Sequence, residues 1–182
     1  MVIMDEAGVE IMDGRGLMRP GSVTRLAESF IGMVVRAGEP KPDISTVEAL
    51  RKTLLAAKTI AYSDSSSGTY LSTVGFKKLG IADEIAGKTR KVRGPPSGEP
   101  VAAVVARGEA EIGFQQVAEL INVPGTDFAG TVPRDIQPPT FFVGVLPNST
   151  EQPEAAVALL RFLSSAEAAP VIMKAGLKPL MR

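Results

Sequence analysis

The chain of 182 residues contains no cysteine, no histidine and no tryptophan. It therefore has no thiol nucleophile and no imidazole base, and a Ser/His/Asp triad or a structural zinc site of the usual ligands is excluded. Disulfide bonds are excluded as well, although this does not indicate a cellular compartment. Any catalysis must use carboxylates, Lys, Tyr or backbone dipoles, and we expect no metal and no cofactor.

Net charge is also absent, because 20 basic residues balance 20 acidic ones. No overall basic field attracts nucleic acid or an anionic membrane. No segment approaches the ~18 apolar residues of a membrane span. The start of the chain carries Asp5 and Glu6 where a secretory signal has a basic region and a long apolar run. As written, the chain is expected to be neither exported by an ordinary signal nor anchored, and hence cytoplasmic.

The composition, 45% hydrophobic and 22% charged, supports a compact core. Short runs rich in Val, Ile and Phe predict buried strands at 30–35, 59–62, 111–114 and 140–146, with a further one at 2–4. Helical signals alternate with them: a capped start at Ser45 or Thr46, a helix from Thr69 to Leu79, one after Pro100, and a final pair over 153–163 and 166–175. This alternation predicts an α/β fold.

The stretch SDSSSGTYLS, residues 63–72, follows one of these strands. A helix that starts there aims unpaired backbone N–H groups and its positive end at the space in front. Serine hydroxyls add donors, and Gly68 allows close approach of a ligand to the backbone. An anion or carboxylate cradle is one interpretation. A solvated capping loop is the other, because Ser and Gly are common in turns and no P-loop lysine follows.

Two further segments are candidates. PPSGEP, residues 95–100, is a second small-residue loop before a helix, and Gln115 and Gln116 follow a buried strand. Ligands of open α/β sheets bind beyond the carboxyl ends of strands, so these residues are placed to contact one. The alternatives stay open: the loop at 95–100 could simply reverse the chain, and the amides of Gln115 and Gln116 could hydrogen-bond a neighbouring loop.

The segments from FIGMVVRAGEPKPDISTVEAL to SDSSSGTYL, VARGEAEIGFQQVAELI, GTDFAGTVPRDIQ and EAAVALLRFLSSAEAAPVIMKAGLKP together resemble the molybdate-type periplasmic solute-binding proteins of ABC transporters. The resemblance implies a type II periplasmic-binding-protein fold, with two α/β lobes joined by two hinge strands. It divides the chain into a remnant of lobe 1 with the first hinge strand (1–35), a complete lobe 2 (36–138), and the second hinge strand with the C-terminal helices of lobe 1 (139–182).

The resemblance also implies a binding site for a small anion. Gln116 stands where the family has a ligand-binding tyrosine, and an amide offers both a donor and an acceptor, so the ligand need not be molybdate. The resemblance matches Ser67 and Gly68 to a ligand-binding backbone position of the family and places Gly98 near a second one. The predicted ligand-binding residues are Ser66, Ser67, Gly68, Thr69, Gly98 and Gln116.

The family has a longer first lobe, with a signal peptide and two further serine loops, so the chain is interpreted as N-terminally truncated. A full-length form would be periplasmic and would work with an ABC permease. The exposed sheet edges of the short form favour a homo-oligomer or a domain swap.

The expected function is capture of a small oxyanion or organic anion as the substrate-binding component of an ABC importer. One alternative is an isomerase of a small unsaturated polycarboxylate, with Tyr62, Tyr70 or Asp64 as the proton-transfer group. The other is a cytoplasmic sensor or a remnant that does not bind.

Overall fold

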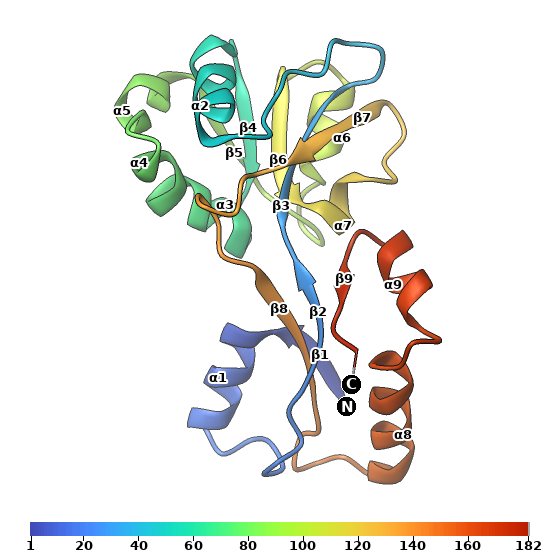
Figure 1. The fold of residues 1–182 in the computed structure, drawn as a ribbon. Helices are drawn as coiled ribbons and strands as arrows, with labels where there is room; N and C mark the ends of the chain where they lie inside the picture. The colour runs from blue at the N-terminus through green and yellow to red at the C-terminus, as the bar shows by residue number, and fades with distance from the viewer. Residues whose placement is uncertain (182) are drawn as a thin grey trace. The chain divides into compact units, whose positions relative to one another are not determined.

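The computed structural model describes residues 1–181, which form two compact units (Figure 1). The first contains residues 1–29 and those from 139 onward, and the second contains residues 30–138. The chain thus leaves the first unit after Ser29, whereas the sequence suggested a lobe boundary after residue 35. Among the described residues, no helix has the length and hydropathy to cross a bilayer.

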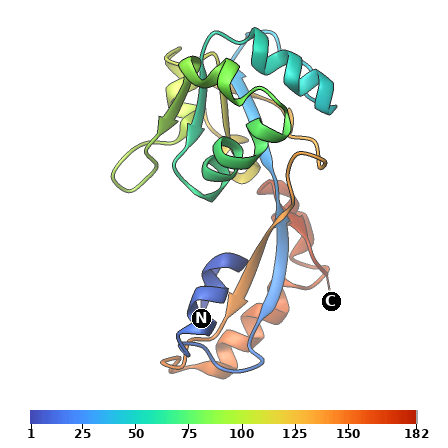
Figure 2. The same cartoon turned by 90° about the vertical axis from the view of Figure 1, so that its left-hand side faces the viewer.

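The first unit is a four-stranded antiparallel sheet with the order β1-β8-β2-β9 and three helices. Gly144 faces Leu160 of one helix, while its neighbours Val143 and Val145 pack with Val9 of another, so helices cover both faces (Figure 2). Its elements are β1 (Val2–Asp5), α1 (Glu6–Gly14), β2 (Thr24–Ser29), β8 (Thr140–Val145), α8 (Pro153–Leu163), α9 (Ala169–Lys174) and β9 (Lys178–Pro179).

The second unit is a five-stranded mixed sheet with the order β5-β4-β6-β3-β7. β4 runs parallel to both of its neighbours, whereas β3 is antiparallel to β6 and β7. Its strands are β3 (Ile31–Arg36), β4 (Ile60–Ser63), β5 (Thr89–Val92), β6 (Ile112–Gln116) and β7 (Thr126–Thr131). Its helical segments are α2 (Val47–Ala56), α3 (Ser66–Tyr70), the π-helix η1 (Leu71–Gly75), α4 (Phe76–Lys78), α5 (Ala82–Ile85), the 3-10 helix η2 (Ala86–Lys88), α6 (Val101–Ala106) and α7 (Val117–Leu120).

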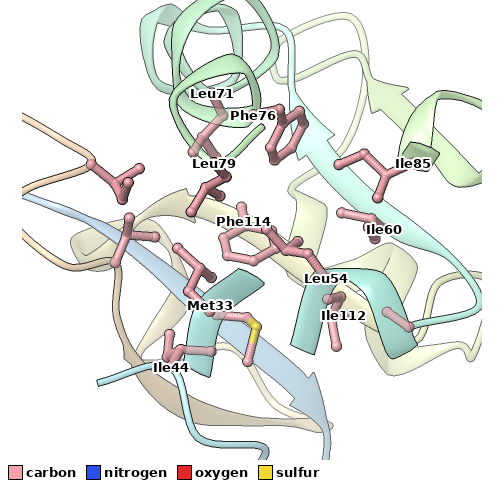
Figure 3. Close-up of a cluster of buried hydrophobic side chains, with 14 of the residues drawn as sticks. Met33, Ile44, Leu54, Ile60, Leu71, Phe76, Leu79, Ile85, Ile112 and Phe114 are labelled. Atoms are coloured by element: carbon pink, nitrogen blue, oxygen red, sulfur yellow. The ribbon is translucent and has the colours of Figure 1, made fainter. Parts of the chain in front are cut away.

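Strand alternation divides the core of this unit into two clusters. Ile60 of β4 belongs to the larger one, which α2, η1 and α4 cover, and its main side chains are shown in Figure 3. The next residue, Ala61, belongs to the cluster beneath α6. Successive strand residues face opposite sides of a sheet, so the two groups of helices lie on opposite faces.

The expected strands and most of the expected helices are present. Thr46, not Ser45, caps α2, because its Oγ1 accepts a hydrogen bond of 3.1 Å from the amide of Ala49. The helix expected to start near Thr69 starts at Ser66, because the amide of Thr69 already donates to the carbonyl of Ser65 at 3.0 Å. The last helix, α9, is shorter than the expected 166–175.

Gln137 is a buried amide that ties together the two segments entering and leaving the second unit. Its Oε1 accepts from the amide of Ile31 at 2.6 Å, and its Nε2 donates to the carbonyls of Ile31 at 3.0 Å and Val132 at 2.6 Å. The side chain is 1% exposed, so water does not compete for these bonds. The start of β3 and the segment after β7 are thereby fixed to each other.

Replacement of Gln137 by Leu should destabilise the fold without creating a large cavity. It removes the partners of the buried amide of Ile31 and of the carbonyl of Val132, while the carbonyl of Ile31 keeps its bond from the amide of Val132. We expect the free energy of unfolding in urea to fall by about 2–4 kcal/mol. Gln152→Leu is the control, because Gln152 is exposed and makes no capping bond to α8. Equal effects of the two substitutions would contradict the role assigned to Gln137.

Candidate functional site

The loops after β4, β5 and β6 leave the same edge of the second sheet. Ser63 pairs with Val92 and Tyr62 pairs with Phe114, so the carboxyl ends of these three parallel strands lie side by side. The chain leaves β4 toward α3 and returns to β6 from α6 on the other face (Figure 1). A point where connections diverge in this way is where open α/β sheets bind ligands.

Three serine hydroxyls meet at the end of β4, and we call Ser63, Ser65 and Ser67 the serine cluster. The Oγ of Ser63 lies 2.6 Å from that of Ser65, and the Oγ of Ser67 lies 3.1 Å from both. Ser63 and Ser67 are buried, whereas Ser65 is exposed. Each hydroxyl rotates and has one hydrogen to donate, so the cluster can redirect its donors toward an anion.

The same loop starts a continuous helical run through α3, η1 and α4, from Ser66 to Lys78. Ser65 is the N-cap, yet its side chain makes no capping bond. The first helical bond runs from the amide of Thr69, so the amides of residues 65–68 precede the hydrogen-bond ladder. These N–H groups carry the positive end of the helix dipole and suit a negative ligand.

Gly68 has a packing role that differs from the expected one. A Cβ at this position would overlap the carbonyl oxygen of Ser63 and lie 2.7 Å from its carbonyl carbon. The missing side chain therefore lets the helix backbone contact the strand backbone, rather than opening the backbone to a ligand. Ser66 and Thr69, its neighbours in the predicted site, are exposed at the same edge.

Gly68→Ala should therefore displace the start of α3 from the end of β4. Overpacking against a backbone carbonyl typically costs 1–3 kcal/mol, and we expect a loss of about 3 kcal/mol in the free energy of unfolding. Gly87→Ala is the matched control, because a Cβ there meets nothing within 4 Å. A thermal or urea transition unchanged by Gly68→Ala would show that the contact is not required.

The loop after β5 repeats this arrangement. A Cβ at Gly98 would overlap the carbonyl oxygen of Arg93, and the amide of Glu99 donates to the same oxygen at 2.9 Å. The helix that follows, α6, differs from α3 at its start, because the amide of Val101 is already used: it donates to Oε1 of Gln115 at 3.1 Å. Gly98 thus lies at the predicted edge, but it packs against the chain, and Gln115 satisfies the neighbouring helix start.

Gln115 also donates from Nε2 to Oε1 of Glu119 at 2.8 Å. Partial burial raises the pKa of the Glu119 carboxyl, and the bond from Gln115 opposes this shift without cancelling it. Gln116, the last residue of β6, is buried opposite Ile31 of β3. The structure therefore brings Gln116 and the predicted residues 66–69 to one edge of the sheet, with Gln115 and Glu119 alongside.

Two of the three residues considered for proton transfer are engaged within the protein. The hydroxyl of Tyr70 donates to the carbonyl of Ile136 at 2.8 Å, and the Asp64 carboxylate accepts from the amide of Gly94 at 2.9 Å. The ring of Tyr62 packs edge-on against Phe76, with centroids 6.1 Å apart. Within residues 1–181, no three acidic side chains gather as metal ligands would.

Sequence reasoning missed Ser63, Ser65 and Glu119. The three serines alternate at positions 63, 65 and 67, but only the turn after β4 brings their hydroxyls together. The raised pKa of Glu119 has no signal in the sequence, because it arises from residues that pack around the carboxyl.

This chain is similar to known proteins in sequence and in fold. The bacterial extracellular solute-binding protein family matches residues 1–178. The chain belongs to this family. Among the curated relatives of this solute-binding protein is an aconitate isomerase from a Pseudomonas species, 43% identical over 179 residues. That match covers 98% of this chain and 67% of the relative.

Solved structures confirm the α/β architecture of a type II periplasmic binding protein. The periplasmic molybdate-binding protein of Azotobacter vinelandii has a TM-score of 0.70 and 24% identity, and the match covers 95% of this chain and 74% of that one. The sulfate-binding protein SubI of Mycobacterium tuberculosis H37Rv has a TM-score of 0.67 and 15% identity, with 98% and 68% covered. At these identities the likeness shows the fold alone.

Proposed function

We propose that this solute-binding protein captures a small organic polycarboxylate at the serine cluster, as the substrate-binding component of an ABC importer. The observation that carries the proposal is the meeting of three hydroxyls with the uncapped start of the helical run at Ser66. Both kinds of group are hydrogen-bond donors, and both lie at the edge where open α/β sheets hold ligands.

A site of this kind suits an anion that must be released again. Hydroxyls and amides hold a carboxylate through several hydrogen bonds, each made stronger by the charge of the acceptor. They carry no full positive charge, so selection depends on the number and direction of the donors. The polycarboxylate class is supported by the 43% identical relative, which is named for aconitate, a tricarboxylate. The molybdate- and sulfate-binding proteins are more distant in sequence.

Ser67→Ala should weaken anion binding. It removes one buried hydroxyl from the cluster and leaves the backbone unchanged, and a hydrogen bond to a charged group is worth about 1.5–3 kcal/mol. We expect the dissociation constant for trans-aconitate, measured by calorimetric titration, to rise about tenfold or more. Ser165→Ala is the control, because the half-buried Ser165 lies in the other unit and its hydroxyl donates to the carbonyl of Phe162.

The same titration with citrate, molybdate and sulfate tests the ligand class. Tighter binding of molybdate or sulfate than of either polycarboxylate would overturn the class but not the site. The absence of heat from every anion, with the chain folded by circular dichroism, would overturn the proposed site.

A second function, isomerisation of an unsaturated polycarboxylate, is favoured by the name of the same relative. Such a reaction removes a proton from one carbon, shifts the double bond, and returns a proton to another carbon. Its atoms and electrons balance without an oxidant or a reductant. A carboxyl whose pKa is raised carries a proton more readily than an ordinary one, and partial burial raises the pKa of Glu119, which lies beside Gln115 at this edge.

Proton NMR in deuterium oxide distinguishes catalysis from simple binding. If the chain is an isomerase, cis-aconitate converts to trans-aconitate and solvent deuterium enters the carbon skeleton. Glu119→Gln should then slow conversion about a hundredfold or more while trans-aconitate still binds. Glu84→Gln, at an exposed position in α5, is the matched control. Binding without conversion would leave the transport function and reject the enzymatic one.

A further inference from the structure

The segment that follows β7 runs along the edge of the second sheet that carries the candidate site. β3 is antiparallel to β6, so Ile31 at its start pairs with Gln116 at the end of β6. β7 ends beside the same part of β3, where Thr131 pairs with Gly32. The chain after β7 therefore begins at the same edge as Gln116, and from there it passes toward α3 (Figure 1).

Hydrogen bonds fix this segment as a turn against α3. The amides of Ile136 and Gln137 donate to the carbonyl of Pro133 at 3.0 and 3.2 Å. The hydroxyl of Tyr70 donates to the carbonyl of Ile136 at 2.8 Å. Tyr70 lies three residues after Ser67, so the two are neighbours on one face of α3. The turn is thus bonded to the helix that carries part of the serine cluster.

Arg134 lies in this turn, and its guanidinium stacks on an aromatic ring. The Cζ atom of Arg134 is 4.7 Å from the centre of the Phe30 ring. Phe30 directly precedes β3, and its carbonyl accepts from the amide of Val117, the residue after Gln116, at 2.9 Å. A guanidinium over an aromatic face is attracted to it and presents its five N–H donors around its rim. A full positive charge is thereby held at this edge of the sheet.

This charge complements the serine cluster in chemistry and in position. Hydroxyls and backbone amides carry no full charge, whereas a polycarboxylate carries two or more, and a guanidinium binds a carboxylate through two parallel hydrogen bonds. β4 and β3 are two places apart in the sheet, about 10 Å at the usual strand spacing. Hydrogen bonds at the two ends take up about 6 Å of this length. The remainder suits two carboxylates on a short carbon chain.

We infer that Arg134 binds a second carboxylate of the polycarboxylate whose first carboxylate the serine cluster holds. This inference rests on the proposed function, and it assigns selection for two or more carboxylates to a named charged group. Phe30 is a positioning residue, because its ring holds the guanidinium and does not itself bind the ligand. A single inorganic oxyanion is too short to contact both groups, so it gains little from Arg134.

Arg134→Gln removes the charge and keeps a polar side chain at an exposed position. We expect the dissociation constant for trans-aconitate, measured by calorimetric titration, to rise about tenfold or more. Added salt should weaken binding to the unaltered chain more than binding to the variant, because salt screens an exposed charge. Arg36→Gln is the matched control: Arg36 is exposed at the opposite end of β3, 2.7 Å from Glu39, and its loss should change neither quantity.

Two substitutions of Phe30 test its positioning role. Phe30→Leu removes the aromatic face and should raise the dissociation constant severalfold, whereas Phe30→Tyr keeps the ring and should bind like the unaltered chain. Circular dichroism and urea unfolding of each variant establish that it is folded before titration. Equal binding by the leucine and tyrosine variants would reject the role of the ring.

The outcomes separate this inference from the proposed function. If Ser67→Ala weakens binding of trans-aconitate and Arg134→Gln does not, the role of Arg134 is overturned and the proposed function stands. If Arg134→Gln weakens binding but leaves its salt dependence unchanged, or has no more effect than Arg36→Gln, the charge contact is overturned. If the folded, unaltered chain binds no polycarboxylate, both the inference and the proposed ligand class fail.

Discussion

The contact between the backbones of Gly68 and Ser63 determines the geometry of the candidate site. Because no side chain separates them, the helix starts directly on the end of β4, and the hydroxyls of Ser65 and Ser67 reach that of Ser63. The same contact between Gly98 and Arg93 shapes the loop after β5. In both loops the glycine lies five residues after the residue that it contacts. The same kind of backbone contact therefore forms a compact turn at the ends of two adjacent strands, β4 and β5.

The two loops nevertheless differ in what their helices offer. The amide that begins α6 is satisfied from within the protein by Gln115, whereas the N-cap side chain of α3 is engaged in the serine cluster and caps nothing. The donors left for an anion therefore gather at one helix start rather than two. This asymmetry supports the serine loop as the proposed binding site, whereas Gln115 is used within the protein to satisfy the start of α6.

Much of the fold could be predicted from the sequence, because continuous apolar runs such as those of β3 and β6 indicate buried strands whatever their partners. β2, β5 and β7 were not recognised, since TRLAES, TRKV and TDFAGT carry charges or glycine and depend on pairing with neighbours. The position of the serine loop was equally readable. The roles of Gly68, Gln115 and Glu119 were not, because each depends on a backbone or side chain that only the folded chain brings close.

The unequal cores of the two units have a thermodynamic consequence. Hydrophobic stabilisation grows with the apolar area removed from water, so the first unit, with nine buried hydrophobic residues, gains much less of it than the second. Gln137 fixes the end of the second unit at the point where the chain leaves it, so local opening is expected to begin in the first unit. The second unit is thus expected to be the more stable of the two, because it rests on a larger core of its own.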